Sequence, residues 1–426
     1  MFRGDTSLID RPITAPLLGF AVAFVIIIGF AGARSYATSV PLLFLALIVA
    51  APPAARSALS GARQSPFLAC TLLYLAWAAL CSTWTSVHLS DLQKALILAL
   101  ILSSAWATVT IAVSSTSRFP VDELRGLRVA FALGATYLFA DYHTDGWVWQ
   151  ALTALNLNKL PAEFTRRATS VPLLLGPLIA SLVWLRYGVS TRLVLSIGPL
   201  LGLGAAFASP HETAMIAVVA LCAATGLGYL LRTWIHWLMT AAWLTCCLAI
   251  IPLSIALHGI GLAEVKWLPE SATDRILIWD GYARKSLTSP LVGHGASLAV
   301  RKSVRIESFE KAVAKRRHAD EASFTLLTAH PHNIYLQNWH ELGAIGAILF
   351  AAIGVTLLNA IRSLPMYARP LSYGAFAAGA AQMVSSYSIW QYWFVCLLCL
   401  SGALLSLVFS ASQAQRNEER RDDPAG

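Results

Sequence analysis

Long apolar stretches, separated by short segments that carry most of the charges, alternate along the chain. A helix that crosses a bilayer needs roughly 20 mainly apolar residues, because lipid offers no hydrogen-bond partner to a free backbone group. The uncharged stretches predict about twelve such helices, at residues 13–31, 36–55, 66–86, 95–114, 126–143, 169–186, 192–209, 213–231, 237–258, 342–361, 371–386 and 390–410. The fifth is the least regular, and residues 146–158 after it could instead lie at the membrane surface.

The last two predicted helices come from one uncharged run, Pro370 to Gln415, which is too long for a single crossing. A polar group at residues 385–388, Ser-Ser-Tyr-Ser, marks the expected turn between them. The fold class is therefore an all-α polytopic membrane protein with one large outer loop between helices nine and ten. We divide the chain into residues 1–258 (helices one to nine), 259–341 (the large loop), 342–410 (helices ten to twelve) and 411–426 (a charged, disordered cytoplasmic tail).

The composition supports a protein embedded in membrane lipids. Hydrophobic residues make up 57% of the chain and charged residues 12%, about half the charged share of an average soluble protein. This excludes a soluble multidomain enzyme and a disordered chain. The formal charge of +9 could suggest a nucleic-acid partner, but the positive residues are spread over short loops, so we expect none.

Lysine and arginine are enriched in cytoplasmic loops, which gives an independent test of the helix count. The short segments at residues 56–63, 118–128 and 186–192 are rich in arginine, whereas the short loops between them hold few basic residues. The alternation holds along the chain, with both ends inside and the loop 259–341 outside. Although Arg3, Arg11 and the apolar run after them resemble a signal peptide, that run exceeds the usual length of about 7–15 residues, so we expect an uncleaved first helix.

The large loop contains amphipathic patterns of its own. Ser271 or Thr273 is expected to cap a helix that starts near Asp274. One face of that helix carries, at i, i+3, i+4 and i+7 spacing, Arg275, Ile278, Trp279 and Tyr282. A second helix is expected at residues 301–322, either as a surface that binds lipid headgroups or as a basic wall that faces an anionic lipid substrate.

Histidines gather just before the tenth helix, in His330-Pro331-His332-Asn333. A histidine at a membrane surface has a suitable pKa for general-base work, although many such histidines are merely interfacial. Zinc would need further ligands, and the candidates in the loop, at positions 294, 318 and 340, lack any metal-binding spacing. We therefore expect no metal site.

The histidine block and its surroundings resemble the bacterial O-antigen ligases. His332-Asn333 is followed after nine residues by Gly343 and after two more by Gly346, like the signature of that family. Residues 275–279 (Arg-Ile-Leu-Ile-Trp) and 290–295 (Pro-Leu-Val-Gly-His-Gly) are similar to its upstream motif, and Arg166-Arg167 resembles an arginine-bearing position in related proteins. The motifs cover about 70 residues, while the expected architecture extends the resemblance over most of the chain. One departure is Glu212, which stands where ligases often carry an arginine.

The resemblance implies an enzyme of the bacterial inner membrane whose active site faces the periplasm. It would transfer a glycan from undecaprenyl pyrophosphate to a sugar hydroxyl of lipid A-core, with inversion and without metal or other cofactor. His332 would be the general base, and Arg275, or failing that Arg167, would bind the pyrophosphate bidentately. The remaining substrate-binding candidates are His330, Asn333, Trp279, Arg166, Arg301 and Arg305.

Three alternatives remain at this point. An O-antigen or exopolysaccharide polymerase of the same superfamily, with a growing glycan as acceptor, shares all these motifs. A transporter of lipid-linked glycans usually places ionisable residues or broken helices near the midplane, often with inverted repeats, whereas here the expected mid-span regions are nearly free of charge. A non-catalytic membrane scaffold is the third alternative.

Overall fold

The computed structural model describes the chain in twelve stretches, and the account below concerns these alone: residues 23–30, 33–50, 65–84, 123–144, 146–154, 167–186, 196–209, 211–296, 304–305, 327–328, 331–385 and 387–422. Nearly all of the regular structure in them is helical. The α-helices with defined bounds are α2 (Tyr36–Ala50), α4 (Pro66–Cys81), α6 (Glu123–His143), α7 (Trp147–Ala154), α9 (Ser170–Arg186), α11 (Ile197–Ala208), α12 (Glu212–Leu231), α13 (Trp234–Leu248), α14 (Ile250–Gly259), α15 (Glu270–Ser286), α17 (Ile334–Arg362), α18 (Arg369–Ser385) and α19 (Tyr392–Asp422). Three short 3₁₀ turns, Ala33–Ser35, Ser82–Trp84 and Leu262–Glu264, and one pair of two-residue antiparallel strands, β1 (Val304–Arg305) and β2 (Leu327–Thr328), complete them.

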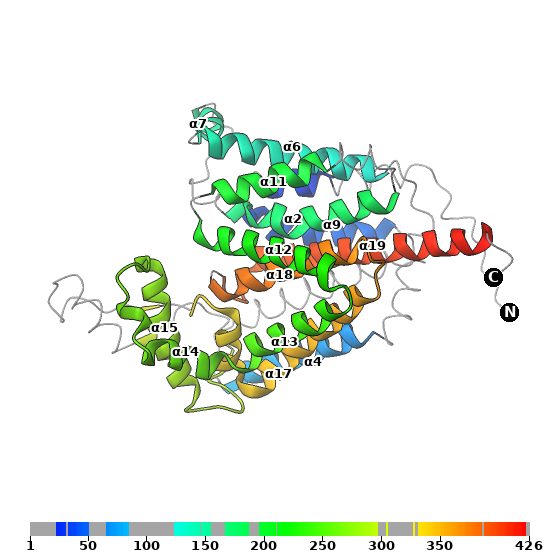
Figure 1. The fold of residues 1–426 in the computed structure, drawn as a ribbon. Coiled ribbons are helices and arrows are strands. Elements are labelled where there is room, and N and C mark those ends of the chain that lie inside the picture. Colours follow the sequence, from blue (N-terminus) through cyan, green and yellow to red (C-terminus); the bar gives the residue numbers. More distant parts are fainter. Residues whose placement is uncertain are drawn as a thin grey trace.

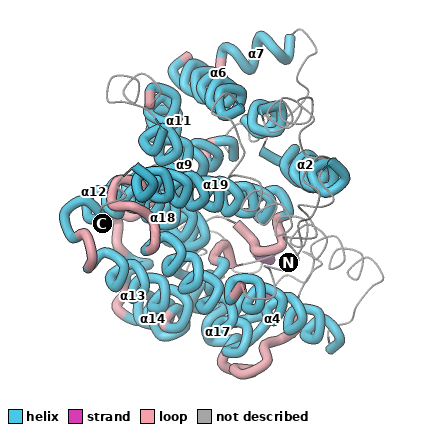
Figure 2. Tube along the Cα trace, turned by 90° about the vertical axis from the view of Figure 1, so that its right-hand side faces the viewer, coloured by secondary structure: helices cyan, strands magenta, loops and turns pink. Residues whose placement is uncertain are grey.

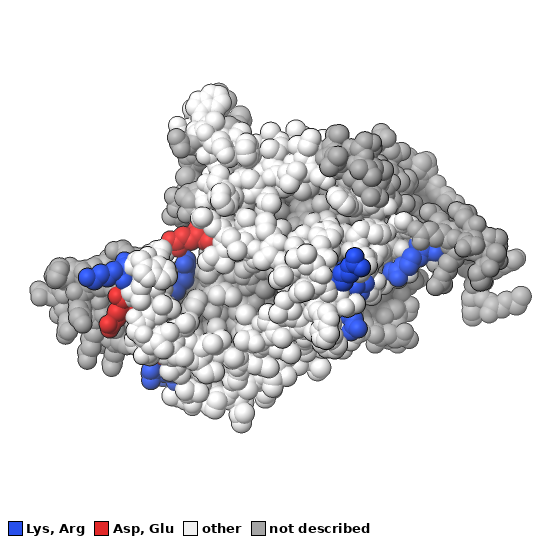
Figure 3. All heavy atoms as spheres, in the orientation of Figure 1, with Lys and Arg blue, Asp and Glu red and all other residues white. Residues whose placement is uncertain are grey.

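Several of these helices are long and apolar enough to cross a membrane. Within the described stretches four qualify by length and composition, Pro66–Trp84, Glu212–Leu231, Ile334–Arg362 and Tyr392–Gln413, and a fifth if α13 and α14 form one broken span. On the face drawn in Figure 3, the described charged side chains lie toward the two ends of the molecule, and the described residues between them are uncharged. The chain is therefore a multi-pass membrane protein, as its sequence predicts. The count of twelve helices stays a prediction, and the expected helix at 95–114 lies outside the described residues.

The helices run roughly side by side in three groups. In Figure 1, α6 and α11 lie above a central group of α2, α9, α12, α18 and α19, and α4, α13 and α17 lie below it. Figure 2, turned by 90°, shows the same order. Helix α12 packs along α18, α6 along α11, and α4 along α17. Helices α14 and α15 lie together at one end of the bundle, opposite the end toward which the last turns of α19 extend (Figure 1).

A bend of 73° separates α13 from α14. Proline has no N–H and its ring clashes with the carbonyl four residues earlier, so Pro252 accounts for a break near Leu248. The Trp339 indole N–H of α17 donates to the Cys247 carbonyl oxygen at the bend, at 2.7 Å. The bend turns α14 away from the direction of α13 and toward α15, on which it packs.

Helix α17 is interrupted after its first nine residues at Gly343, whose φ of 66° and ψ of −165° are not helical. The loop at residues 290–295 fills this interruption. The Ala344 N–H donates to the Pro290 carbonyl oxygen at 2.8 Å, and the Gly295 N–H donates to the Glu341 carbonyl oxygen at 3.0 Å. A Cβ atom on Gly343 would lie 2.3 Å from the Leu291 oxygen, and one on Gly293 would lie 2.4 Å from the Glu341 backbone. The upstream and downstream motifs of the sequence are thus joined backbone to backbone, and glycine permits that approach.

Four local expectations from the sequence are wrong. Helix α15 begins at Glu270, not near Asp274, because Pro269 fixes the entry to the helix with a φ of −56°, and no side chain caps it. Val304 and Arg305 pair with β2 instead of belonging to a helix at 301–322; valine favours strands, and the rest of that segment lies outside the described residues. The tail expected to be disordered from residue 411 continues α19 to Asp422, since glutamine, alanine, arginine and glutamate favour helix. The tenth helix also starts earlier than expected, at Ile334.

Candidate active site

Helix α15 is attached to the histidine block by one side chain. The indole N–H of Trp279 donates to the carbonyl oxygen of Pro331, at 3.0 Å. Tyr282, one turn further along the same face, packs edge-on against the ring of His340 in α17, with the ring centres 4.9 Å apart. The face of α15 predicted from the sequence is therefore the face that meets α17, and it carries Arg275 one turn before Trp279.

His332 occupies a tight turn directly before α17. Its φ of 52° is unusual for a residue other than glycine, although histidine adopts this region more often than most. Asn333, which is fully buried, caps α17: its side-chain oxygen accepts from the Leu336 N–H at 3.0 Å. Among the described residues, the Asn333 amide nitrogen has no hydrogen-bond partner. The cap and the bond from Trp279 to Pro331 thus hold the half-buried His332 from both sides.

Arg275 does not stand alone. Its Nη1 lies 3.4 Å from Oε2 of Glu212, the first residue of α12, and the Ser271 hydroxyl donates to the same oxygen at 2.5 Å. The Arg275 side chain is 23% exposed and that of Glu212 is 45% exposed. Glu212, the one residue that departs from the ligase pattern, therefore contacts the arginine that we expected to bind phosphate.

Arg167 lies near Tyr387, which belongs to the turn between α18 and α19. The Tyr387 phenol is buried in that turn and within hydrogen-bond distance of the Ser170 hydroxyl, at 3.2 Å. Burial raises the pKa of Tyr387, while the bond with Ser170 and the charge of Arg167 partly oppose this rise. Two residues before Tyr387, the Ser385 hydroxyl donates to that of Thr213 at 3.1 Å, next to Glu212. The turn beside Arg167 is thus connected to the start of α12, where Glu212 meets Arg275.

The structure brings five of the predicted site residues to one region. They are Arg167, Arg275, Trp279, His332 and Asn333. Arg166, His330 and Arg301 lie outside the described residues. Arg305 is described only through its backbone, which pairs with Leu327. Trp279 and Asn333 each use one polar group to hold the histidine turn, and their contact with substrate stays a prediction.

A buried network supports the kinked part of α17. The Gln337 side-chain amide donates to Glu341 at 2.7 Å and to the Ser388 hydroxyl at 3.0 Å, and its oxygen accepts from the Ile389 N–H. Glu341 also accepts from the Trp390 indole N–H at 2.5 Å. These bonds tie the first turns of α17, which follow His332, to the α18–α19 turn beside Arg167.

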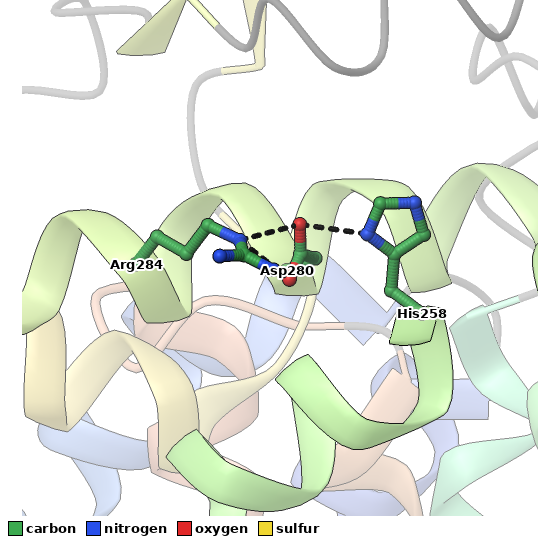
Figure 4. A network of polar contacts seen from close by, with 3 residues as sticks. All are labelled: His258, Asp280 and Arg284. Atoms are coloured by element: carbon green, nitrogen blue, oxygen red, sulfur yellow. Dashed lines mark hydrogen bonds and ion pairs between the residues drawn. The ribbon is translucent and has the colours of Figure 1, made fainter. Parts of the chain in front are cut away.

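A second polar network joins α14 to α15, as Figure 4 shows. Asp280 is 1% exposed; its carboxylate lies 2.8 Å from Nδ1 of His258 and accepts from Nε of Arg284 at 3.0 Å. The hydrogen bond and charge of Asp280 raise the pKa of Arg284. In sequence Asp280 follows Trp279 directly, so on the helix it faces away from the Arg275 side. We assign it to holding α15 against α14.

No group of three or more His, Cys, Asp or Glu side chains placed to hold a metal ion occurs in the part of the chain that the structure describes. His294 and His340, two of the candidates considered from the sequence, stack on each other with ring centres 4.7 Å apart. Nδ1 of His294 lies 3.2 Å from the His340 carbonyl oxygen. Independence of metal remains a prediction.

Several residues of this region were not found from the sequence. Glu212 was noted only as a departure from the family pattern, and its pairing with Arg275 spans 63 positions along the chain. Tyr387 and Ser388 belong to the polar group that marks the turn between the last helices, and that group was the one signal of their role. Asp280 had no signal beyond being an acidic residue in an amphipathic helix.

Comparison with known proteins finds sequence matches in the part of the chain that holds α12, α15 and the histidine block. Residues 197–351 match the sequence model described as O-antigen ligase. Two relatives, from Rickettsia felis and Rickettsia conorii, each named "Putative polysaccharide ligase", are 32% identical over 126 residues. The match covers 29% of this chain and 29% of each relative, so it spans less than a third of their length. Residues 197–351, which hold α11 to the middle of α17, are therefore similar to an O-antigen ligase domain, and the resemblance carried by the histidine block is confirmed.

Proposed function

We propose that this protein transfers a glycan from undecaprenyl pyrophosphate to a hydroxyl group of a lipid A-core sugar. The observation that carries the proposal is the bond from Trp279 to Pro331, because it holds the helix that carries Arg275 against the turn that carries His332. A phosphate-binding cation and a candidate base are thereby kept in one region. The match of residues 197–351 to the O-antigen ligases supports the same reading.

In this proposal His332 is the general base. The acceptor hydroxyl loses its proton to His332 while its oxygen attacks the anomeric carbon of the donor glycan. The bond from that carbon to the pyrophosphate oxygen breaks, and the electron pair leaves with undecaprenyl pyrophosphate. A single displacement of this kind inverts the anomeric centre. General-base catalysis contributes about 10²–10⁴-fold, and the strained backbone of His332 is a feature often found at functional sites.

The arginines balance the charge of the leaving group. Pyrophosphate is already a good leaving group, so binding its charge matters more than protonating it. Arg275 is the first candidate because its fork matches phosphate oxygens bidentately, and Arg167 is the second. Asn333 and Trp279 position His332, through the helix cap and the bond to Pro331.

Ligation is favoured over the alternatives by two observations. The relatives are named as polysaccharide ligases, which favours ligase over polymerase. The described charged residues lie toward the two ends of the face in Figure 3, whereas a transporter usually carries ionisable groups near its midplane. We assign the end with α14 and α15 to the periplasmic side of the inner membrane, because the arginine-rich short segments are expected to be cytoplasmic and their alternation leaves residues 259–341 outside.

The test is lipopolysaccharide gel analysis of a strain that lacks this protein and makes a complete O-antigen. Free lipid-linked polymer together with bare core supports the ligase. A core that bears a single repeat would instead indicate a polymerase, and an unchanged pattern would refute both. Wild-type protein should restore the pattern, and His332→Ala, expressed to the same level, should not.

A further inference from the structure

Glu212 already places a negative charge where the donor's pyrophosphate is expected. Its Oε2 lies 3.4 Å from Nη1 of Arg275 and accepts the Ser271 hydroxyl. Because it is the first residue of α12, its carboxylate also lies at the positive end of a helix of 20 residues. A carboxylate and a phosphate oxygen offer an arginine the same kind of acceptor.

The ion pair between Arg275 and Glu212 is weak enough for another anion to replace Glu212. Both side chains reach solvent, since Arg275 is 23% and Glu212 is 45% exposed. Ion pairs of this kind are weak, and the best of them change an equilibrium only about fivefold. A pyrophosphate with several charged oxygens can therefore take the place of a single carboxylate oxygen on Arg275. Ser271 would retain Glu212 nearby, because its hydroxyl comes from the same helix α15.

We propose that Glu212 is an exchangeable internal anion: it holds Arg275 aligned in the unloaded protein and yields it to the pyrophosphate of the donor. Glu212 is then a positioning residue that sets the affinity for the donor and for the pyrophosphate product. The inference rests on the proposed function, because it takes Arg275 as the pyrophosphate-binding residue. It also gives a role to the departure from the ligase pattern, because the carboxylate at position 212 competes with the pyrophosphate for Arg275.

The test is transfer of lipid-linked glycan to acceptor by the full-length protein in detergent, with the KM for donor, kcat and inhibition by inorganic pyrophosphate measured separately. Glu212→Gln keeps the size and an acceptor for Ser271 but removes the charge. We expect about a two- to fivefold fall in the KM for donor and in the inhibition constant of pyrophosphate, with kcat changed less than the KM. Glu212→Asp, which restores the charge, should move both constants back toward wild type.

A matched control separates exchange from a general effect of charge. Glu264 is an exposed acidic residue near α14 and α15, so Glu264→Gln removes the same charge without touching Arg275, and its KM should equal that of wild type. An unchanged or raised KM in Glu212→Gln, or an equal fall in Glu264→Gln, overturns the exchange.

Variants of Arg275 distinguish failure of the exchange from failure of the proposed function. Arg275→Ala should raise the KM for donor and weaken inhibition by pyrophosphate, and Glu212→Gln should then have no further effect, because the partner is gone. If Arg275→Ala behaves like wild type in both constants, Arg275 does not bind pyrophosphate and the exchange falls with that assignment. If Arg275→Ala raises the KM but Glu212→Gln does not lower it, only the exchange is refuted.

Discussion

We expect Gly343→Ala to separate the loop at residues 290–295 from α17. The glycine has a φ of 66° and a ψ of −165°, a region that is essentially restricted to glycine. An alanine there costs about 1–3 kcal/mol of backbone strain. Its Cβ would also lie 2.3 Å from the Leu291 oxygen, so the loop at residues 290–295 must withdraw.

Withdrawal of the loop breaks at least two backbone hydrogen bonds. The bonds at risk are Ala344 to Pro290, at 2.8 Å, and Gly295 to Glu341, at 3.0 Å. Each contributes about 0.5–1.5 kcal/mol. Together with the strain, the predicted loss of stability is about 2–6 kcal/mol. Activity should fall as well, because the bonds between the loop and α17 set the direction of the first turns of α17, which directly follow His332.

The assay is the melting midpoint of the purified protein in detergent, with glycan transfer measured on the same samples. Gly402→Ala is the matched control, because a Cβ on this residue of α19 meets no atom within 4 Å. Alanine is favoured over glycine in a helix by about 1 kcal/mol, so the control should melt at or slightly above the wild-type midpoint. A Gly343→Ala protein that melts and works like Gly402→Ala would refute the reasoning.

Three further predictions concern the same end of the molecule. Trp279→Phe removes the bond to Pro331 and should lower kcat by about two- to tenfold, the equivalent of one hydrogen bond. The control, Trp339→Phe, loses a bond to Cys247 at the bend after α13 and should lower the melting midpoint with less effect on kcat. Equal effects of the two variants on kcat would contradict the role of Trp279. Asp280→Ala leaves His258 and Arg284 without their shared partner and should lower the melting midpoint by an amount equivalent to about 1.5–3 kcal/mol. An unchanged melting midpoint would mean that this network does not hold α14 to α15. Enzyme treated with EDTA should keep its transfer activity, and a loss that zinc or magnesium restores would overturn the metal-independent mechanism.

The sequence predicted those features that depend on local pattern. Apolar length predicted membrane helices, the polar group at residues 385–388 located the turn between α18 and α19, and the spacing from Arg275 to Tyr282 identified the face of α15 that meets α17. Each of these signals lies within one helix or one turn, where a single sequence suffices to read it.

Features that depend on distant contacts were missed. The break of α17 at Gly343 depends on a loop some fifty residues earlier, which supplies backbone partners on both sides of the break. Ser271 was expected to cap a helix, but its hydroxyl is bound by Glu212, 59 positions away. Tyr387 meets Ser170 across 217 positions. Polar side chains find such partners only when the helices pack, and no periodicity in one sequence reveals them.

The most direct test of the account is glycan transfer in vitro by purified His332→Ala, at a protein level and melting midpoint matched to wild type. If His332 is the base, activity should fall by about 10²–10⁴-fold, while insertion and accumulation stay normal. His330→Ala should do less damage, and His143→Ala, which changes an exposed histidine at the end of α6, should do none. Activity of His332→Ala at a tenth of wild type or better would contradict the assignment of the base and the mechanism built on it.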